Sequence, residues 1–218
     1  MSAHETRLLL LGAVAMFEPI NGYQIRRELV SWEVDKWAHV NPGSIYHGLA
    51  RLTEQGHLVR HELRDGTRDV AVYELTAQGR DELATLMRSS LETVDPYDSV
   101  AFHAAFSMLP LMGRNEVLAA LEARRRGLEE TIARFPEAEL ETGERAKDWG
   151  PPHALRAVLL WRDTSVTELA WLERTLRDIE NGSLRFERHE DWGWEPPADD
   201  PGWQMELDRT KYRALLGR

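Results

Sequence analysis

The side chains best suited to chemistry gather in one short amphipathic segment, Pro42–Gln55, which has the pattern of a helix. Proline is preorganised for a first helical turn, and the asparagine before it is a good cap. Ile45, Leu49 and Leu52 fall on the inward face, which leaves the opposite face to polar groups. Hydroxyl, imidazole and guanidinium groups donate to phosphates and base acceptors, and arginine can bind guanine through two hydrogen bonds. The candidate DNA-contacting residues of this helix are Ser44, Tyr46, His47 and Arg51.

A solvated helix face, with Ser44 acting only as a cap, is the alternative for this segment. The residues that follow favour the first interpretation. Two alternating segments, His57–Arg64 and Val70–Thr76, flank a polar turn over residues 65–69. This order of helix, helix stop, strand, charged turn and strand is typical of a winged helix. In that fold the helix enters a DNA major groove, and the hairpin reaches the neighbouring backbone or minor groove.

The turn of this hairpin supplies the expected wing contacts. Arg64, Thr67 and Arg68 carry donors suited to phosphates or to the minor groove. Asp65 and Asp69 in the same turn oppose such contacts, so a wing held away from DNA stays an alternative.

Other parts of the first half are expected to hold the helix and the hairpin in place. Residues 5–17 are apolar nearly all round, which is typical of a helix buried on most sides. A turn over residues 18–22 leads into a second helix, Tyr23–Trp32, and Thr76 caps a further helix after the hairpin. Tyr23 is a candidate phosphate donor, although a purely structural tyrosine fits equally well.

Other chemistries find little support in the sequence. His57 and His61 lie four residues apart, but on a strand and without a carboxylate triad around them, so no metal site is predicted. No Ser-His-Asp set, glycine-rich phosphate loop or pair of carboxylates stands out. We therefore expect neither an enzyme nor a cofactor.

Composition bounds the class of protein. The 218 residues suit one or two domains, and 42% hydrophobic with 29% charged residues is typical of a globular protein. The chain has no cysteine, so disulfides and thiolate metal sites are excluded. The apolar run Leu8–Phe17 is far shorter than the about 20 residues that span a bilayer. A cytoplasmic protein without a membrane partner is expected.

The net charge of −10 is unusual for a DNA-binding protein, for which a basic face is the usual footprint. Residues 1–92 carry 10 Lys/Arg against 13 Asp/Glu, a net of −3, and the remainder carries −7. Phosphates respond to charge within a Debye length, about 8–10 Å, so a local strip can act on an acidic body. The strip would consist of Arg51, Arg60, Arg64 and Arg68.

The second half of the chain has a purely helical pattern. Asp95-Pro96 marks the expected boundary, after which helices are predicted over residues 97–109, 114–135 and His153–Glu180, with a connector over 136–152. The last helix has a broad apolar stripe, part of which we interpret as a dimer seam. The alternative is that the stripe covers the helix 114–135 within one chain. The candidate dimerisation residues are Leu155, Leu159, Val166, Leu169, Leu172 and Leu176.

Aromatic residues are the least determined element of the second half. They can stack on a flat ligand, although aromatic side chains at helical spacing more often form core. The junction between the two parts is the expected place for such a pocket, because a ligand there could favour one dimer geometry over another. The candidate effector-binding residues are Trp37, Phe102, Phe106 and Trp161, with Trp149 and Trp171 as further aromatic groups.

Three motifs occur in order in the first half: Gly22-Tyr23-Gln24-Ile25 with Leu29, Pro42-Gly43-Ser44-Ile45-Tyr46 with Leu49, Leu52, Gly56 and Leu58, and Tyr73-Glu74-Leu75-Thr76 with Gly79. In this order and spacing, residues 8–90 resemble the PadR family of bacterial transcriptional regulators. Residues 97–181 resemble more loosely the C-terminal helical domain of the larger PadR proteins. The resemblance implies a homodimeric repressor that dimerises through this domain and that a small molecule, such as a phenolic compound, often releases from DNA.

The expected fold is mainly α with a small β-hairpin: a winged helix-turn-helix DNA-binding domain (1–93), an all-α dimerisation and effector domain (97–181) and a tryptophan-containing tail (182–218). The tail holds Trp192, Trp194 and Trp203, and Trp203–Leu216 has the pattern of one more short helix. The expected partners are double-stranded DNA, a second copy of the chain and a small aromatic effector. A winged-helix module that binds another protein through its acidic surface, and a ligand binder or enzyme built on the aromatic helices, are the alternatives.

Overall fold

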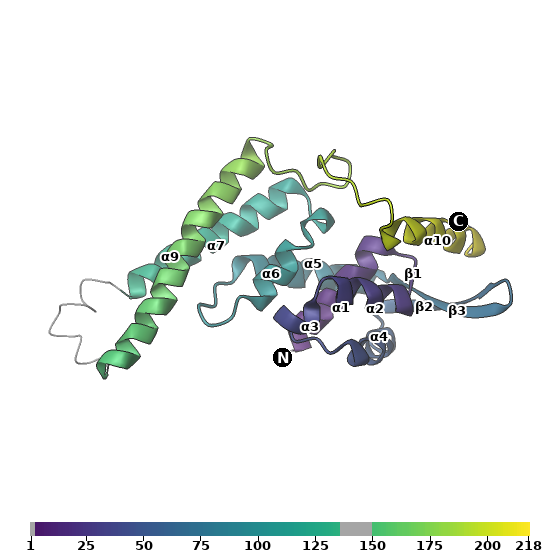
Figure 1. Ribbon diagram of the computed structural model, residues 1–218, viewed down its shortest axis with the longest axis horizontal. Helices are drawn as coiled ribbons and strands as arrows, with labels where there is room; N and C mark the ends of the chain where they lie inside the picture. The colour runs from purple at the N-terminus through teal and green to yellow at the C-terminus, as the bar shows by residue number, and fades with distance from the viewer. Residues whose placement is uncertain (1–2, 136–149) are drawn as a thin grey trace.

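The computed structural model describes residues 3–135 and 150–218. Trp149 and most of the predicted connector 136–152 lie outside these residues. The fold is mainly helical with a small antiparallel sheet, which confirms the predicted fold class (Figure 1). The first half comprises α1 (Ala3–Phe17), β1 (Ile20–Asn21), α2 (Gly22–Ser31), α3 (Val34–Trp37), the 3-10 turn η1 (Pro42–Ser44), α4 (Ile45–Glu54), β2 (Leu58–Asp65), β3 (Arg68–Leu75) and α5 (Ala77–Glu92).

The sheet has three strands in the order β1-β3-β2, where a two-stranded hairpin was predicted. The turn prediction for residues 18–22 was therefore wrong in part, because Ile20 and Asn21 pair with Tyr73 and Val72 of β3. The hairpin turn is also tighter than predicted. Asp65 and Arg68 are already paired, which leaves only residues 66 and 67 in the turn, with the glycine at φ +63°.

Close contacts with two glycines fix α4 against its neighbours. A Cβ at Gly48 would lie 2.5 Å from Leu10 Cδ1, so a larger residue there would displace this buried side chain between α1 and α4. A Cβ at Gly22 would lie 3.0 Å from the ring of Tyr46, which places the start of α2 against the outer side of α4. The side chains facing inward from α4 are buried as predicted: Ile45, Leu49 and Leu52.

Local signals also explain the ends of the helices on either side of the wing. The Asn21 side chain accepts from the backbone of Gln24, whose own side chain accepts from the Asn21 N–H, so the two residues form a capping box at α2. The Thr76 hydroxyl accepts from Gly79 N–H at 3.0 Å and begins α5, as predicted.

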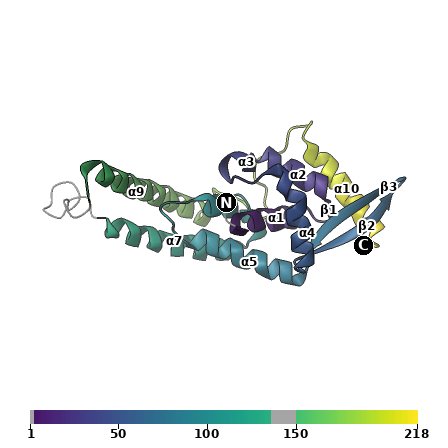
Figure 2. The same cartoon turned by 90° about the horizontal axis from the view of Figure 1, so that it is seen from below.

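The second half comprises α6 (Val100–Phe106), the 3-10 turn η2 (Leu109–Leu111), α7 (Arg114–Arg134), α9 (Pro152–Glu180) and α10 (Pro201–Leu215). α9 lies beside α7 in both views (Figures 1 and 2), and it ends at Asn181-Gly182 with the glycine at φ +77°, as predicted. One cluster of buried apolar residues runs from α1 through α5 to α9. Division of the chain into separate domains therefore stays a prediction.

Arg124 is the largest polar side chain in the core, with 1% of its surface exposed. Its guanidinium donates to Glu168 of α9 at 2.6 Å and to the carbonyl of Thr93 after α5. The same group lies 3.9 Å from the ring centre of Phe102 in α6. One charge on α7 thus joins three neighbouring segments.

The tail returns to the first half of the chain. Phe186 is buried, and Arg114 pairs with Glu187 and Glu190. Backbone N–H groups of Glu187 and then Phe186 hold the pKa of the Glu190 carboxyl below its ordinary value. α10 then lies beside β1, so the predicted short helix is present and begins two residues earlier than Trp203. Among the residues described, none of the helices combines the length and hydrophobicity needed to cross a bilayer.

We predict that Arg124→Ala lowers the free energy of unfolding by about 3–5 kcal/mol, because Glu168 and the Thr93 carbonyl lose a buried partner. Urea unfolding followed by circular dichroism measures the change. Arg125→Ala is the matched control, since this neighbouring arginine pairs only with Glu122 and Glu129 at the surface and its removal should leave the unfolding midpoint nearly unchanged. Similar midpoints for the two variants would contradict the role assigned to Arg124.

Candidate nucleic-acid interface

The outer face of α4 carries most of the donors that the sequence assigned to it. Tyr46, His47 and Arg51 are exposed, and Tyr46 has 48% of its surface accessible. Within the described part of the chain, the Arg51 side chain has no hydrogen bond or ion pair. A guanidinium without a partner is free to bind a phosphate or a base edge.

Ser44 differs from the other members of this set. It is half-buried, and its hydroxyl donates to the Asn41 carbonyl at 2.8 Å. The cap of the preceding turn is Asn41, whose side chain accepts from Gly43 N–H at 2.8 Å. Only the acceptor capacity of the Ser44 hydroxyl remains, so its geometry supports a local structural role.

Tyr23 lies at the start of α2 with 63% of its surface exposed. Its neighbour Gly22 touches the ring of Tyr46, which brings the start of α2 and the outer face of α4 together. Both phenol groups therefore stand on one side of the molecule, as a joint surface for a polar partner requires.

The wing carries two free guanidinium groups. Arg64 and Arg68 are exposed and have no ion pair in the part of the chain that the structure describes. Thr67 is exposed in the turn between them. Arg60, by contrast, pairs with Glu62 at 2.7 Å, which removes it from the predicted basic strip.

The wing acid Asp65 is not free either, because it forms an ion pair with Lys211 of α10. The hydrogen bond and charge of Asp65 raise the pKa of Lys211, so the ammonium stays charged at neutral pH and its contribution is lost as the pH rises through that raised value. Sequence reasoning missed Lys211, because 146 residues separate it from its partner and no periodic pattern connects the two.

The two histidines of the hairpin do not converge on a common point. His61 pairs with Glu74 at 2.9 Å, and His57 lies 3.4 Å from an Arg7 nitrogen. Among the described residues, no group of three histidine or acidic side chains could hold a metal ion.

Most of the predicted dimer seam is covered within the chain. Leu159, Leu172 and Leu176 are buried, and Leu155 and Leu169 pack against buried clusters. Val166 stays 39% exposed, and Leu160, outside the predicted set, is 64% exposed. The structure therefore supports the alternative reading for most of the stripe and leaves a narrower apolar surface on α9.

The predicted effector residues separate into two groups. Phe102 and Phe106 stack edge-on against Trp171, with ring centres 5.9 and 5.1 Å away. Together with Leu160 they line a groove of about 670 Å³ between α6 and α9, which we call the α6–α9 groove. Trp37 and Trp161 lie elsewhere: Trp37 donates to the Trp32 carbonyl, and Trp161 packs against Tyr97.

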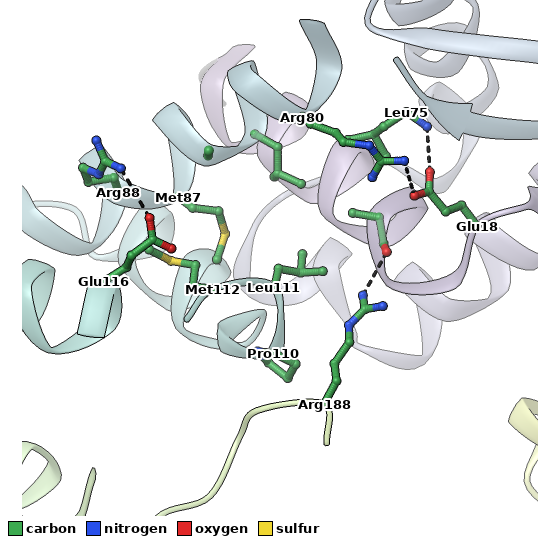
Figure 3. A pocket seen from close by; sticks show the side chains of 13 residues that line it. Glu18, Leu75, Arg80, Met87, Arg88, Pro110, Leu111, Met112, Glu116 and Arg188 are labelled. Carbon is green, nitrogen blue, oxygen red and sulfur yellow. Dashed lines mark hydrogen bonds and ion pairs between the residues drawn. The ribbon is translucent and has the colours of Figure 1, made fainter. Parts of the chain in front are cut away.

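A second cavity, of about 410 Å³, lies at the junction that the sequence analysis favoured for an effector (Figure 3). Its apolar lining comes from β3, α5 and the segment after α6, and three arginines surround it. Arg80 donates to Glu18 at 2.6 Å and Arg188 to the Ala15 carbonyl at 2.9 Å, and Figure 3 shows Arg80 turned toward Glu18. The predicted aromatic residues are not among its lining residues. The apolar lining residues are Leu75, Leu83, Met87, Pro110, Leu111 and Met112.

Comparison with known proteins identifies the first half of the chain. Residues 10–85 match the model of the Transcriptional regulator PadR-like family. This segment contains α4, the whole sheet and the first half of α5. No protein in the curated set matches the chain.

Several solved structures are similar to the chain at low identity. A Streptococcus mutans protein is 19% identical, with 81% of this chain and 99% of that chain covered and a TM-score of 0.35. Bacillus subtilis PadR, solved in complex with operator DNA, is 19% identical, with 78% and 98% covered and a TM-score of 0.31. A PadR-like regulator from Bacillus cereus is 16% identical, with 79% and 94% covered and a TM-score of 0.31.

These likenesses are too weak to place individual residues, so the family match carries the identification. The family is one of transcriptional regulators and not of enzymes, in line with the expectation from the sequence. Residues 10–85 of this chain form a domain of the PadR-like family of transcriptional regulators.

Proposed function

We propose that the protein is a cytoplasmic, homodimeric repressor that binds an inverted-repeat operator and that a small effector releases. Residues 1–93 would bind DNA and residues 97–181 would hold the two copies together. The observation that carries the proposal is the shared exposure of Tyr46, Arg51 and Arg68 on an α4-and-wing frame, with both guanidinium groups unpaired in the described chain.

The geometry fits one reading helix in each major groove. α4 is a ten-residue helix that exposes one polar face, and the wing extends beyond it (Figure 2). Two copies related by a twofold axis would place their α4 helices about 34 Å apart, one turn of the duplex. The start of α2, with Tyr23, would then face the backbone beside the groove.

The α6–α9 groove is the best candidate for the dimer surface. Leu160 leaves apolar area exposed next to Phe106 and Trp171, and such an area needs a partner if it exceeds a few hundred Å². A second copy supplies an equal surface with twofold symmetry. In this arrangement Phe102 and Phe106 belong to the interface and not to a separate ligand site.

The junction cavity is the better place for an effector in this scheme. It is lined by β3 and α5 on one side and by residues 110–112 on the other. A ligand that binds one relation of these parts more tightly than another would change the separation of the two α4 helices.

A protein-interaction module remains the second candidate function, because the chain carries a net charge of −10. An electrophoretic shift with the DNA upstream of the protein's own gene separates the two. Retardation supports the repressor, and a chain that is folded but leaves this DNA unshifted supports the module.

Arg51→Ala should weaken binding to the operator by about 1–3 kcal/mol if this guanidinium reads a base. Titration of operator and of random DNA measures the change. A loss confined to the operator identifies base contact, whereas equal losses on both identify a phosphate contact. Arg126→Ala on α7 removes the same charge from an exposed site outside the α6–α9 groove and controls for net charge; if it matched Arg51→Ala, the role of α4 would be refuted.

Arg68→Ala should reduce the slope of log K against log salt by about one unit, because one phosphate contact is lost. Operator titrations between low and physiological salt measure the slope. Arg60→Ala is the control on the same hairpin, since Arg60 already pairs with Glu62. An unchanged slope for Arg68→Ala would remove the wing from the interface.

Leu160→Glu should convert the dimer to a monomer, because a carboxylate in an apolar interface loses its solvation. Analytical ultracentrifugation gives the mass in solution. Leu207→Glu on α10 is the matched control, since Leu207 is equally exposed, at 65%, outside the proposed interface. A dimer that survives Leu160→Glu would show that the two copies meet elsewhere.

A further inference from the structure

α10 is attached to the DNA-binding part of its own chain by specific polar contacts. The Asn21 side-chain amide donates to the Tyr212 hydroxyl at 2.9 Å, and the Gln24 amide donates to Asp208 Oδ2 at 2.8 Å. Tyr212 and Met205 are buried, and burial raises the pKa of the Tyr212 hydroxyl, which therefore stays protonated. The end of the tail is thus a docked helix.

Asn21 and Gln24, the two residues in these contacts, form the capping box at the start of α2. Asn21 and Gln24 already bond each other's backbone N–H groups, which leaves their amide NH₂ groups to find partners. Tyr212 and Asp208 accept from these groups one turn apart on α10. The position of α10 is therefore tied to the start of α2, next to Tyr23 and Gly22.

The same helix reaches the wing. Lys211 pairs with Asp65 at the hairpin turn, and Arg218 donates to Glu74 at 3.0 Å. The strand register places Asp65 and Glu74 on one face of the hairpin, together with Val72, which is fully buried. α10 and the residues after it therefore lie on the face of the hairpin that carries these side chains.

We propose that α10 is a clamp that fixes the wing relative to α2 and thereby raises operator affinity without touching DNA itself. The clamp rests on the proposed DNA-binding function. Lys211 and Tyr212 are its positioning residues: Tyr212 holds α2, and Lys211 holds the wing and offsets the acid of Asp65.

Two physical effects give the clamp its consequence. A two-stranded ribbon that extends from a domain is mobile, and ordering it at the moment of binding weakens affinity. A wing that α10 already holds in the unbound protein avoids this loss of affinity. In addition, the charges of Arg64, Asp65, Arg68 and Asp69 cancel, so the Lys211 ammonium gives the turn one net positive charge toward phosphates.

Tyr212→Ala in the full chain tests the clamp. We expect operator affinity to fall on the order of tenfold, because side chains of the wing are then ordered only on binding. Hydrogen exchange should accelerate at the amides of α10, β2 and β3 and stay unchanged in α7 and α9. Thr210→Ala is the matched control, because its exposed hydroxyl bonds only the Glu206 carbonyl within α10.

Lys211 is tested by a double-mutant cycle with Asp65. Lys211→Ala should weaken operator binding about two- to fivefold in the unaltered background and have a smaller effect when Asp65 is already asparagine, because only the charge of Lys211, and not an ion pair with the wing, is then lost. Lys211→Arg should retain the affinity. An equal loss in both backgrounds would mean that Lys211 contacts DNA directly, which overturns its role as a positioning residue.

The outcomes separate this proposal from the function on which it rests. If the unaltered chain fails to bind its upstream DNA, the repressor proposal fails, and hydrogen exchange in the hairpin still decides whether α10 holds the wing. If Tyr212→Ala releases α10 but leaves hairpin exchange and operator affinity unchanged, the clamp is wrong. Tighter operator binding by that variant would also overturn it, because α10 would then obstruct the wing.

Discussion

A buried arginine sets the arrangement on which the other parts of this molecule depend. The Arg124 guanidinium has almost no contact with solvent, so its charge needs partners within the core. It finds Glu168 on α9, the Thr93 carbonyl after α5 and the ring of Phe102 on α6. These groups come from three segments, which the charge on α7 joins. Since α5 follows directly on the wing strand β3, the same charge relates the helical half to the half proposed to bind DNA.

The elements near the proposed interface could be predicted from sequence because their signals are local. Asn41 and Pro42 begin the 3-10 turn that leads into α4, Thr76 caps α5, and alternation predicts the two strands of the hairpin. The missed strand β1 has only two residues, and its pairing with β3 crosses fifty residues of chain. The residues that dock α10 are separated further in sequence, since 191 positions lie between Tyr212 and its partner Asn21. Neither hydrophobic periodicity nor a turn motif links residues so far apart. The sequence therefore predicts the helix itself but not the segment against which it packs.

The helical half shows a different limit. A stripe of leucines has the same spacing whether it packs on its own chain or on a second copy. The structure assigns Leu159, Leu172 and Leu176 to the first kind of contact, and leaves Leu160, outside the predicted set, exposed one position away. Aromatic residues present the same ambiguity. Phe102 was a candidate ligand contact by type, yet its ring already packs against Arg124 and Trp171.

The acidic balance of the chain is less of an obstacle to DNA binding than its total suggests, because a phosphate responds to nearby charge. Around the wing, three acids are already engaged, Glu62 by Arg60, Glu74 by His61 and Arg218, and Asp65 by Lys211, and Asp69 has no ion pair among the described residues. The arginines at positions 51, 64 and 68 are left without such partners in the described chain. Two of the cations that engage these acids come from the C-terminal end, in the half of the chain with the more negative net charge. The tail can therefore make the wing more attractive to phosphates while the protein as a whole stays acidic.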